Sequence, residues 1–228
     1  MELTGDKKPI IISAGIGGHY PAGIDRLERS LIFNGWAGDI LMLKDYPPDC
    51  PSHEENPYAF KPYLFNHVFN LGYKVVLWLD SSFWALKNPM PMIDFINENG
   101  LYFFKSGYPI SATATDKLLR YENEYREDLV DVPEFATGAV GINISNPLGE
   151  EFFKRWMIHC DLAMFKGNRI HDENDSKHPL FKFSRQDQSS ASMILHKMGI
   201  KNIETPEWIS YYGTGYNEKD LMFFIGGI

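Results

Sequence analysis

The residues best suited to chemistry in this sequence lie where an apolar run stops. Asp80, Ser81 and Ser82 directly follow residues 75–79, which read Val-Val-Leu-Trp-Leu. A continuous apolar run of this kind is typical of a strand buried on both faces of a parallel sheet. A carboxylate at the end of such a strand can hold a cation, and hydroxyl oxygens can add to the site. The structural alternative is that Asp80 bonds the backbone amides of the next turn.

A second carboxylate, Asp187, stands beside Gln188 near the start of a segment with helical periodicity. We expect this helix to run from Gln186 to Met198, with Gly199 just after its end. At a sheet edge, Asp187 could serve as a general base toward a substrate hydroxyl. The structural alternative is that an acidic residue in the first turn stabilises the helix through its dipole.

A glycine-rich turn, Gly-Ile-Gly-Gly-His-Tyr at residues 15–20, follows the first predicted strand, Pro9 to Ser13. Tyr20 stands where the third glycine of a GxGxxG dinucleotide motif would be, and the turn has no Walker lysine. The glycines would let the backbone approach a ligand, and Tyr20 could stack on a base. The alternative is a turn that only needs positive φ angles.

Strands and helices alternate along the chain, which predicts an α/β fold with a mostly parallel central sheet covered by helices on both faces. All residues, 1–228, are expected to form a single domain. Ligands of such sheets bind outside the carboxyl ends of the strands. A charged, helix-like stretch covers 116–129, and the polar segment 166–182 is expected to be a mobile loop over the site. The predicted strands are 9–13, 40–43, 75–79, 101–104 and 139–144, and the predicted helices begin near Pro21, Pro62, Pro91, Pro147 and Gln186.

Composition excludes several classes of function. The net charge is −8, from 22 basic and 30 acidic residues, and no run of Lys or Arg indicates a nucleic-acid partner. No apolar run approaches the ~18 residues needed to span a bilayer. Cys50 and Cys160 form no CxxC pair of a zinc or redox site. We therefore expect a cytoplasmic protein with no nucleic-acid partner and no membrane insertion.

Three segments occur in an order and spacing that resemble a known family. They are "KPYLFNHVFNLGYKVVLWLDSS" from Lys61, "EFATGAVGIN" from Glu134 and "RQDQSSASMIL" from Arg185. Together they resemble the GT-A-fold glycosyltransferases, in particular the group of glycogenin and the bacterial lipooligosaccharide galactosyltransferases. The first is similar to the unit that ends in that family's Asp-x-Asp, the second to its Phe-Asn-Ala-Gly-Val strand and the third to its Asp-Gln-Asp helix start.

The sequence departs from the family pattern at several positions. Ser82 stands for the second Asp of Asp-x-Asp, Ala136-Thr137 for the Asn-Ala pair, and Ser189 for the last Asp of Asp-Gln-Asp. The C-terminal His-x-x-Gly-x-x-Lys is not visible, and residues 208–216 occupy its place. A site with one carboxylate fewer holds a divalent ion more weakly.

The resemblance implies a nucleotide-sugar site, with UDP favoured over GDP as the nucleotide of the donor. Asp80 and Ser82 would hold Mn²⁺ or Mg²⁺ weakly, so that the ion is dispensable, and Lys61 or Lys87 could supply positive charge instead. Asp187 and Gln188 would be the catalytic residues facing the reacting sugar. The donor-binding residues implied by the resemblance are Ala14, Gly15, Tyr20, Lys61, Asp80, Ser81, Ser82, Thr137 and Gly138.

The resulting hypothesis is a glycosyltransferase that moves a sugar from a nucleotide-diphosphate donor to a glycan or another hydroxyl acceptor. Whether the anomeric configuration is retained or inverted stays open. The alternative is a catalytically inactive module of the same fold that binds a nucleotide-sugar or a glycan. A nucleotidyltransferase would need a phosphate loop rich in Arg or Lys after the first strand, and residues 14–20 contain neither.

Overall fold

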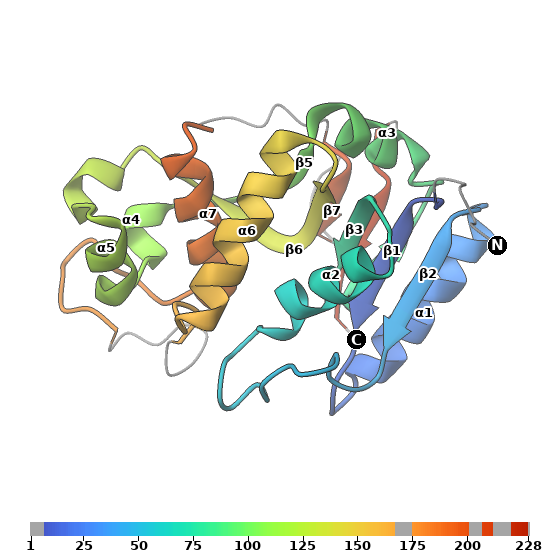
Figure 1. The fold of residues 1–228 in the computed structure, drawn as a ribbon, viewed down its shortest axis with the longest axis horizontal. Coiled ribbons are helices and arrows are strands. Elements are labelled where there is room, and N and C mark those ends of the chain that lie inside the picture. Colours follow the sequence, from blue (N-terminus) through green and yellow to red (C-terminus); the bar gives the residue numbers. More distant parts are fainter. Residues whose placement is uncertain (1–6, 167–174, 201–206, 212–219, 228) are drawn as a thin grey trace.

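A five-stranded central sheet organises the protein (Figure 1). The computed structural model describes residues 7–166, 175–200, 207–211 and 220–227. The strands lie in the order β2-β1-β3-β6-β5. Their bounds are β1 (Ile10–Ala14), β2 (Asp39–Leu43), β3 (Val75–Leu79), β5 (Leu101–Pro109) and β6 (Pro133–Asn143).

Four of the five strands run in one direction, and β6 runs against them. β1 pairs in parallel with β2 and with β3, whereas β6 is antiparallel to both β3 and β5. This confirms the predicted α/β fold with a mostly parallel sheet. Because Leu79 pairs with Ala139, the residues just before Ala139 lie beside the carboxyl end of β3. The reversed strand thus brings its first half to the edge where ligands of such sheets bind.

Helices cover both faces of the sheet, as predicted. Successive strand residues point to opposite faces, so Ile10 and Ile12 belong to one core cluster and Ile11 to the other. The first face is covered by α2 (Phe60–Asn70), α6 (Pro147–Asp161) and α7 (Gln186–Lys197). The second is covered by α1 (Tyr20–Phe33), α3 (Met90–Asn99) and a small sheet.

The small sheet was not predicted, because its three-residue strands are too short to show a period. It has the order β4-β8-β7, from β4 (Phe83–Ala85), β7 (Ile209–Tyr211) and β8 (Phe223–Ile225). The helix-like stretch 116–129 forms two separate pieces, because Asn123 adopts a left-handed conformation with φ 53°. These pieces are α5 (Asp116–Glu122) and the 3₁₀ helix η1 (Arg126–Leu129), and they pack beside the short α4 (Ile110–Thr113).

Two predictions fall partly outside the described residues. Of the expected loop at 166–182, residues 167–174 lie outside them, and 175–182 form an irregular segment in which Lys182 N donates to Ala112 O. Of the C-terminal segment 208–216, residues 212–216 lie outside them. Within the described part of the chain, no helix is long and apolar enough to cross a bilayer.

Candidate functional site

Two pockets meet at the carboxyl ends of β1 and β3. The larger, which we call the aromatic pocket, has a volume of about 380 Å³, within the range of small-molecule sites. The smaller, the carboxylate pocket, has about 220 Å³. Both are walled by Tyr58, Lys61 and Asp80. The aromatic pocket is also lined by Ala14, Ile16, Tyr20, Tyr46, His53, Phe60, Trp78, Ser81 and Ser82, and the carboxylate pocket by Thr137, Gly138, Arg185, Gln186, Asp187 and Gln188.

The structure brings almost all of the predicted site residues to these two pockets. Those of the first and third strand ends line the aromatic pocket, and those of β6 and α7 line the carboxylate pocket. Among the donor-binding residues implied by the resemblance, Gly15 is the exception, because it lines neither pocket. Its amide donates to Leu43 O of the neighbouring strand, and a side chain there would collide with the backbone carbonyl of Tyr20. Gly15 therefore does not touch the pocket space but lets the backbone at Tyr20, which lines the pocket, pack closely behind it.

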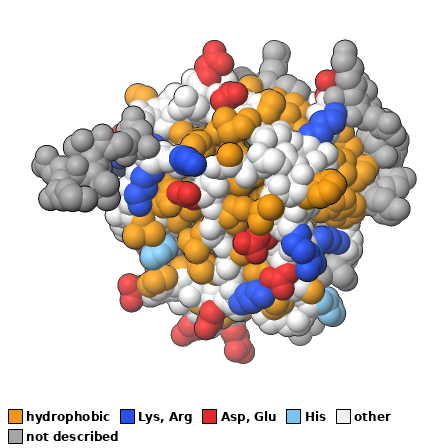
Figure 2. All heavy atoms as spheres, turned by 90° about the vertical axis from the view of Figure 1, so that its right-hand side faces the viewer, with side chains coloured by type: hydrophobic (Ala, Val, Ile, Leu, Met, Phe, Trp, Pro, Cys, Tyr) orange, Lys and Arg blue, Asp and Glu red, His pale blue; other side chains and the backbone are white. Residues whose placement is uncertain are grey.

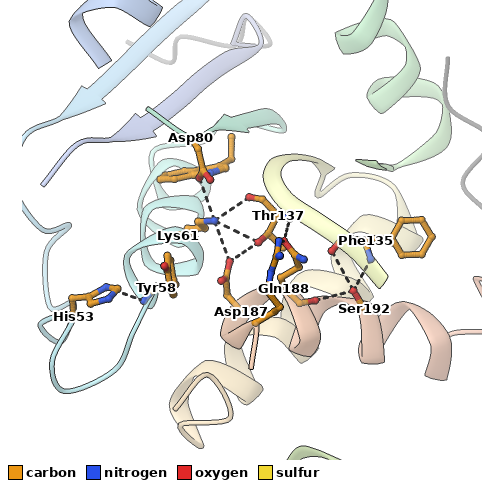
Figure 3. Close-up of polar contacts among 11 residues, drawn as sticks. His53, Tyr58, Lys61, Asp80, Phe135, Thr137, Asp187, Gln188 and Ser192 are labelled. Carbon is orange, nitrogen blue, oxygen red and sulfur yellow. Dashed lines mark hydrogen bonds and ion pairs between the residues drawn. The ribbon is translucent and has the colours of Figure 1, made fainter. Parts of the chain in front are cut away.

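Lys61 is the centre of the site (Figure 3). Its ammonium lies 3.2 Å from Asp80 Oδ1 and 3.1 Å from Asp187 Oδ2, and donates to Thr137 O at 3.0 Å. The Lys61 and Asp187 side chains are 4% and 5% exposed, whereas that of Asp80 is 37% exposed. Four segments thus converge on one buried cation: α2, the end of β3, β6 and the start of α7.

The local charges shift the pKa values of this group. Burial alone would lower the pKa of Lys61, but the attraction of Asp187 and Asp80 outweighs it and raises that pKa. Burial also raises the pKa of Asp80, against the pull of Lys61 and of the hydrogen bond from Trp78. Lys61 therefore stays a cation at neutral pH, held by two carboxylates of unequal exposure.

The Asp80 carboxylate is directed to the site and not to the turn after β3. That turn is closed by its backbone, with Phe83 N donating to Asp80 O at 3.0 Å. The carboxylate accepts a hydrogen bond of 2.7 Å from Trp78 Nε1 and pairs with Lys61. The Asp80 carboxylate therefore does not cap the turn that follows β3, and it lies at the wall of both pockets.

Asp187 is likewise held by partners from other elements. Thr137 Oγ1 donates to Asp187 Oδ2 at 2.7 Å, from the position where the family pattern has a different residue. The preceding residue, Gln186, has a φ of 42°, a conformation that is costly for a residue with a side chain. Such strain is often found at functional sites. Here it turns the chain so that the first turn of α7 faces the carboxylate pocket.

Glu134 is a site residue that the sequence did not reveal. It is fully buried in β6, and its carboxylate accepts from Gln188 Nε2 at 2.6 Å, from Ser106 Oγ at 2.7 Å and from Ser189 Oγ at 3.2 Å. These bonds fix the Gln188 amide. Ser189, which departs from the family pattern, also packs here: its hydroxyl lies 3.2 Å from this carboxylate and 3.1 Å from Thr113 O, and its one proton can be donated to either.

The aromatic wall was missed as well. Tyr46, His53 and Tyr58 come from the long connection between β2 and α2, which the sequence identifies only as a loop rich in proline. Tyr58 has a φ of 61°, and its amide donates to His53 Nδ1. Burial lowers the pKa of His53, although the charge of Asp187 acts in the opposite direction. The usable signal was the position of this loop at the carboxyl edge of the sheet, where loops carry function.

Basic groups at the site are few. Arg185 lines the carboxylate pocket and donates to Gln188 Oε1 at 3.1 Å, whereas Lys87 is exposed and lines neither pocket. Figure 2 shows the side of the molecule with β2 and α1, where Lys and Arg side chains lie among Asp and Glu side chains. That face lacks the single-sign basic patch that nucleic acids require.

The expected metal site at Asp80 and Ser82 stays a prediction, and the residues around it do not fit an ion held by the protein. Among the described residues, no group of three or more His, Cys, Asp and Glu side chains could hold a metal ion. Asp80 Oδ1 is already shared by Trp78 Nε1 and the Lys61 ammonium. A divalent ion needs several oxygen ligands close to it, and a lysine cation occupies the space between the two carboxylates.

The fold that carries this site is a glycosyltransferase fold. No family model and no curated protein match the sequence, so the likeness rests on solved structures. The apo structure of WbbM, a bifunctional glycosyltransferase, matches 99% of this chain with a TM-score of 0.58 and 14% identity. This chain spans 46% of the length of that chain.

A second solved structure shows the same fold at nearly full length. It is a glycosyltransferase involved in the glycosylation of the major capsid of PBCV-1. The match has a TM-score of 0.52 and 13% identity and covers 96% of this chain and 93% of that chain. Together the two likenesses confirm the glycosyltransferase fold that the sequence motifs indicated.

Proposed function

We propose that this chain transfers a sugar from a nucleotide-diphosphate donor to a hydroxyl of a glycan or another acceptor. The observation that carries the proposal is the junction of an aromatic pocket and a carboxylate pocket at Lys61 and Asp80, at the ligand-binding edge of a glycosyltransferase fold. The base and ribose would occupy the aromatic pocket, between Tyr20 and the loop that carries Tyr46, His53 and Tyr58. The sugar would extend past Asp80 into the carboxylate pocket.

The roles of the residues follow from this placement. In the reaction the bond between the anomeric carbon and the diphosphate oxygen breaks, and a bond to the acceptor oxygen forms. The acceptor proton must pass to a base, for which the Asp187 carboxylate is the proposed group in an inverting reaction. Gln188, fixed by Glu134, would hold a sugar hydroxyl. We propose UDP rather than GDP as the nucleotide.

Nucleotide binding and donor turnover test this proposal. Titration of UDP, GDP, ADP and CDP by calorimetry should show that UDP binds, and a screen of UDP-sugars should show donor hydrolysis that Asp187→Asn abolishes. UDP binding without any turnover, with or without acceptors, would favour the inactive binding module. If none of the four nucleotides binds up to millimolar concentration, the proposal is wrong.

A further inference from the structure

The Lys61 ammonium has the complete set of partners that it can take. An ammonium group carries three N–H donors and no acceptor. Lys61 Nζ has three close oxygen partners, one each from Asp80, Asp187 and Thr137, at 3.2, 3.1 and 3.0 Å. These oxygens belong to three different parts of the fold, the end of β3, the start of α7 and the middle of β6. A single cation thus joins the elements that form the carboxylate pocket.

The Lys61 ammonium occupies the place, between Asp80 and Asp187, where a divalent ion would have to lie to neutralise both carboxylates. Mg²⁺ needs oxygen ligands at about 2.0–2.1 Å, closer than Lys61 Nζ lies to either carboxylate. An ion could enter between Asp80 and Asp187 only if the side chain of Lys61 moved out. Lys61 is 3% exposed, so the ion would leave a buried ammonium beside a second positive charge. That arrangement is strongly unfavourable in a buried site.

We propose that Lys61 is the built-in cation of this centre, so that the donor nucleotide binds and reacts without a divalent metal ion. The inference rests on the proposed function and specifies its cofactor requirement. Lys61 lines both pockets and therefore lies at the point where a donor diphosphate would cross between them. By pairing with Asp80 and Asp187, Lys61 lowers the negative charge that the donor diphosphate would meet at this point. Arg185 in the carboxylate pocket would supply the positive charge facing the diphosphate as its bond to the sugar breaks.

The first test uses the wild-type chain. UDP is titrated by calorimetry in excess EDTA and again with millimolar Mn²⁺. The expected result is that the two Kd values agree within about twofold, and that hydrolysis of UDP-sugars proceeds at similar rates in both buffers. A loss of affinity or rate of about tenfold or more in EDTA, equivalent to about 1.4 kcal/mol, overturns the inference.

The second test uses Mn²⁺ alone and so does not depend on nucleotide binding. The signal of free Mn²⁺ is followed by electron paramagnetic resonance during titration of wild type, Lys61→Ala and the double variant Lys61→Ala/Asp187→Asn. We expect no binding to wild type, binding to Lys61→Ala where the carboxylates are freed, and loss of that binding in the double variant. Mn²⁺ binding to wild type that Asp80→Asn removes would overturn the inference.

The two tests separate this inference from the proposed function. If UDP binds in neither buffer, the proposed function fails. The Mn²⁺ titration of the variants then tests by itself whether Lys61 takes the place of a divalent ion. If Lys61→Ala does not fold, the wild-type UDP titration decides, because equal affinity in EDTA and in Mn²⁺ supports the inference and a tenfold loss in EDTA contradicts it. Folding of each variant is checked by circular dichroism before titration.

Discussion

The two carboxylates around Lys61 should contribute very differently to stability, although they lie at nearly the same distance from it. Asp187 Oδ2 is 3.1 Å and Asp80 Oδ1 is 3.2 Å from the ammonium, but their side chains are 5% and 37% exposed. Replacement by Asn removes each charge and keeps an oxygen that can accept from Thr137 or Trp78. The comparison of Asp187→Asn with Asp80→Asn thus isolates the effect of burial on an ion pair.

The expected magnitudes follow from solvent screening. Removing one partner of a buried pair costs about 3–5 kcal/mol, because the other charge is left uncompensated. Lys61 would keep Asp80, so we expect the lower end, about 3 kcal/mol, for Asp187→Asn. The Asp80 side chain is 37% exposed, so water partly screens its pair with Lys61 and we expect a smaller cost, about 1 kcal/mol, for Asp80→Asn. For a chain of this size each kcal/mol shifts Tm by about 2–4 °C.

Urea unfolding followed by tryptophan fluorescence measures both costs, with thermal unfolding as a second method. The slope of free energy against urea should stay unchanged, so that the difference lies in the midpoint. Equal losses for the two variants, or a larger loss for Asp80→Asn, would refute the assignment of a buried and an exposed partner. The same variants measured in 1 M salt give a control, because screening should reduce only the contribution of Asp80.

Two further predictions concern the turn before α1 and the contact between α5 and α6. Gly15→Ala should weaken UDP binding and lower the free energy of unfolding by about 1–3 kcal/mol, because its Cβ would collide with the Tyr20 carbonyl behind the aromatic pocket. Calorimetry and urea unfolding measure the two effects. Glu122→Gln should cost about 1–3 kcal/mol at neutral pH, and urea unfolding at several pH values should show this cost shrink in acid. Burial alone would raise the pKa of Glu122, but the 2.7 Å hydrogen bond from His159 outweighs it and holds that pKa below its ordinary value of 4.5.

The sign of the pH effect follows from linkage, and the glycine variant has a matched control. A carboxylate whose pKa is lowered by folding stabilises the folded state above its ordinary pKa and loses this contribution as the pH falls through the folded value. The gap between wild type and Glu122→Gln should therefore narrow below about pH 4.5, and a constant gap would contradict the prediction. As the control for Gly15→Ala, Gly227→Ala should change neither UDP binding nor the free energy of unfolding, because no atom lies within 4 Å of the added Cβ.

Much of the fold could be predicted because its signals are local. The apolar run at 75–79 indicated a buried central strand, and the periodicity after Pro147 and Gln186 located two of the helices that cover it. The rule that ligands bind at the carboxyl ends of strands then placed Asp80 at the site, and the resemblance to a family added Asp187. The three-residue strands of the small sheet carry no such period, and they were missed for that reason.

The site could be predicted only in part from the sequence. The sequence identified Asp80, Asp187 and Lys61 as separate residues, and for the two carboxylates it left a structural alternative open. Neither Glu134 nor Tyr58 was singled out, because nothing local shows that Glu134 binds Gln188 or that Tyr58 lines both pockets. Their roles depend on which side chains of distant segments lie beside them. Conformational strain, as at Tyr58, is also invisible until the backbone is known.

The sequence by itself determined the order of the strands and helices of the main sheet, the apolar faces that must be buried and the polar residues that interrupt them. Only the tertiary structure decided the direction of β6 and the meeting of Lys61 with Asp80 and Asp187. The physical reason is that secondary structure follows from the pattern of neighbouring residues, whereas the energy of a buried charge depends on its partners in space. A lysine on α2 becomes the cation of the site because β3, β6 and α7 surround it with oxygens.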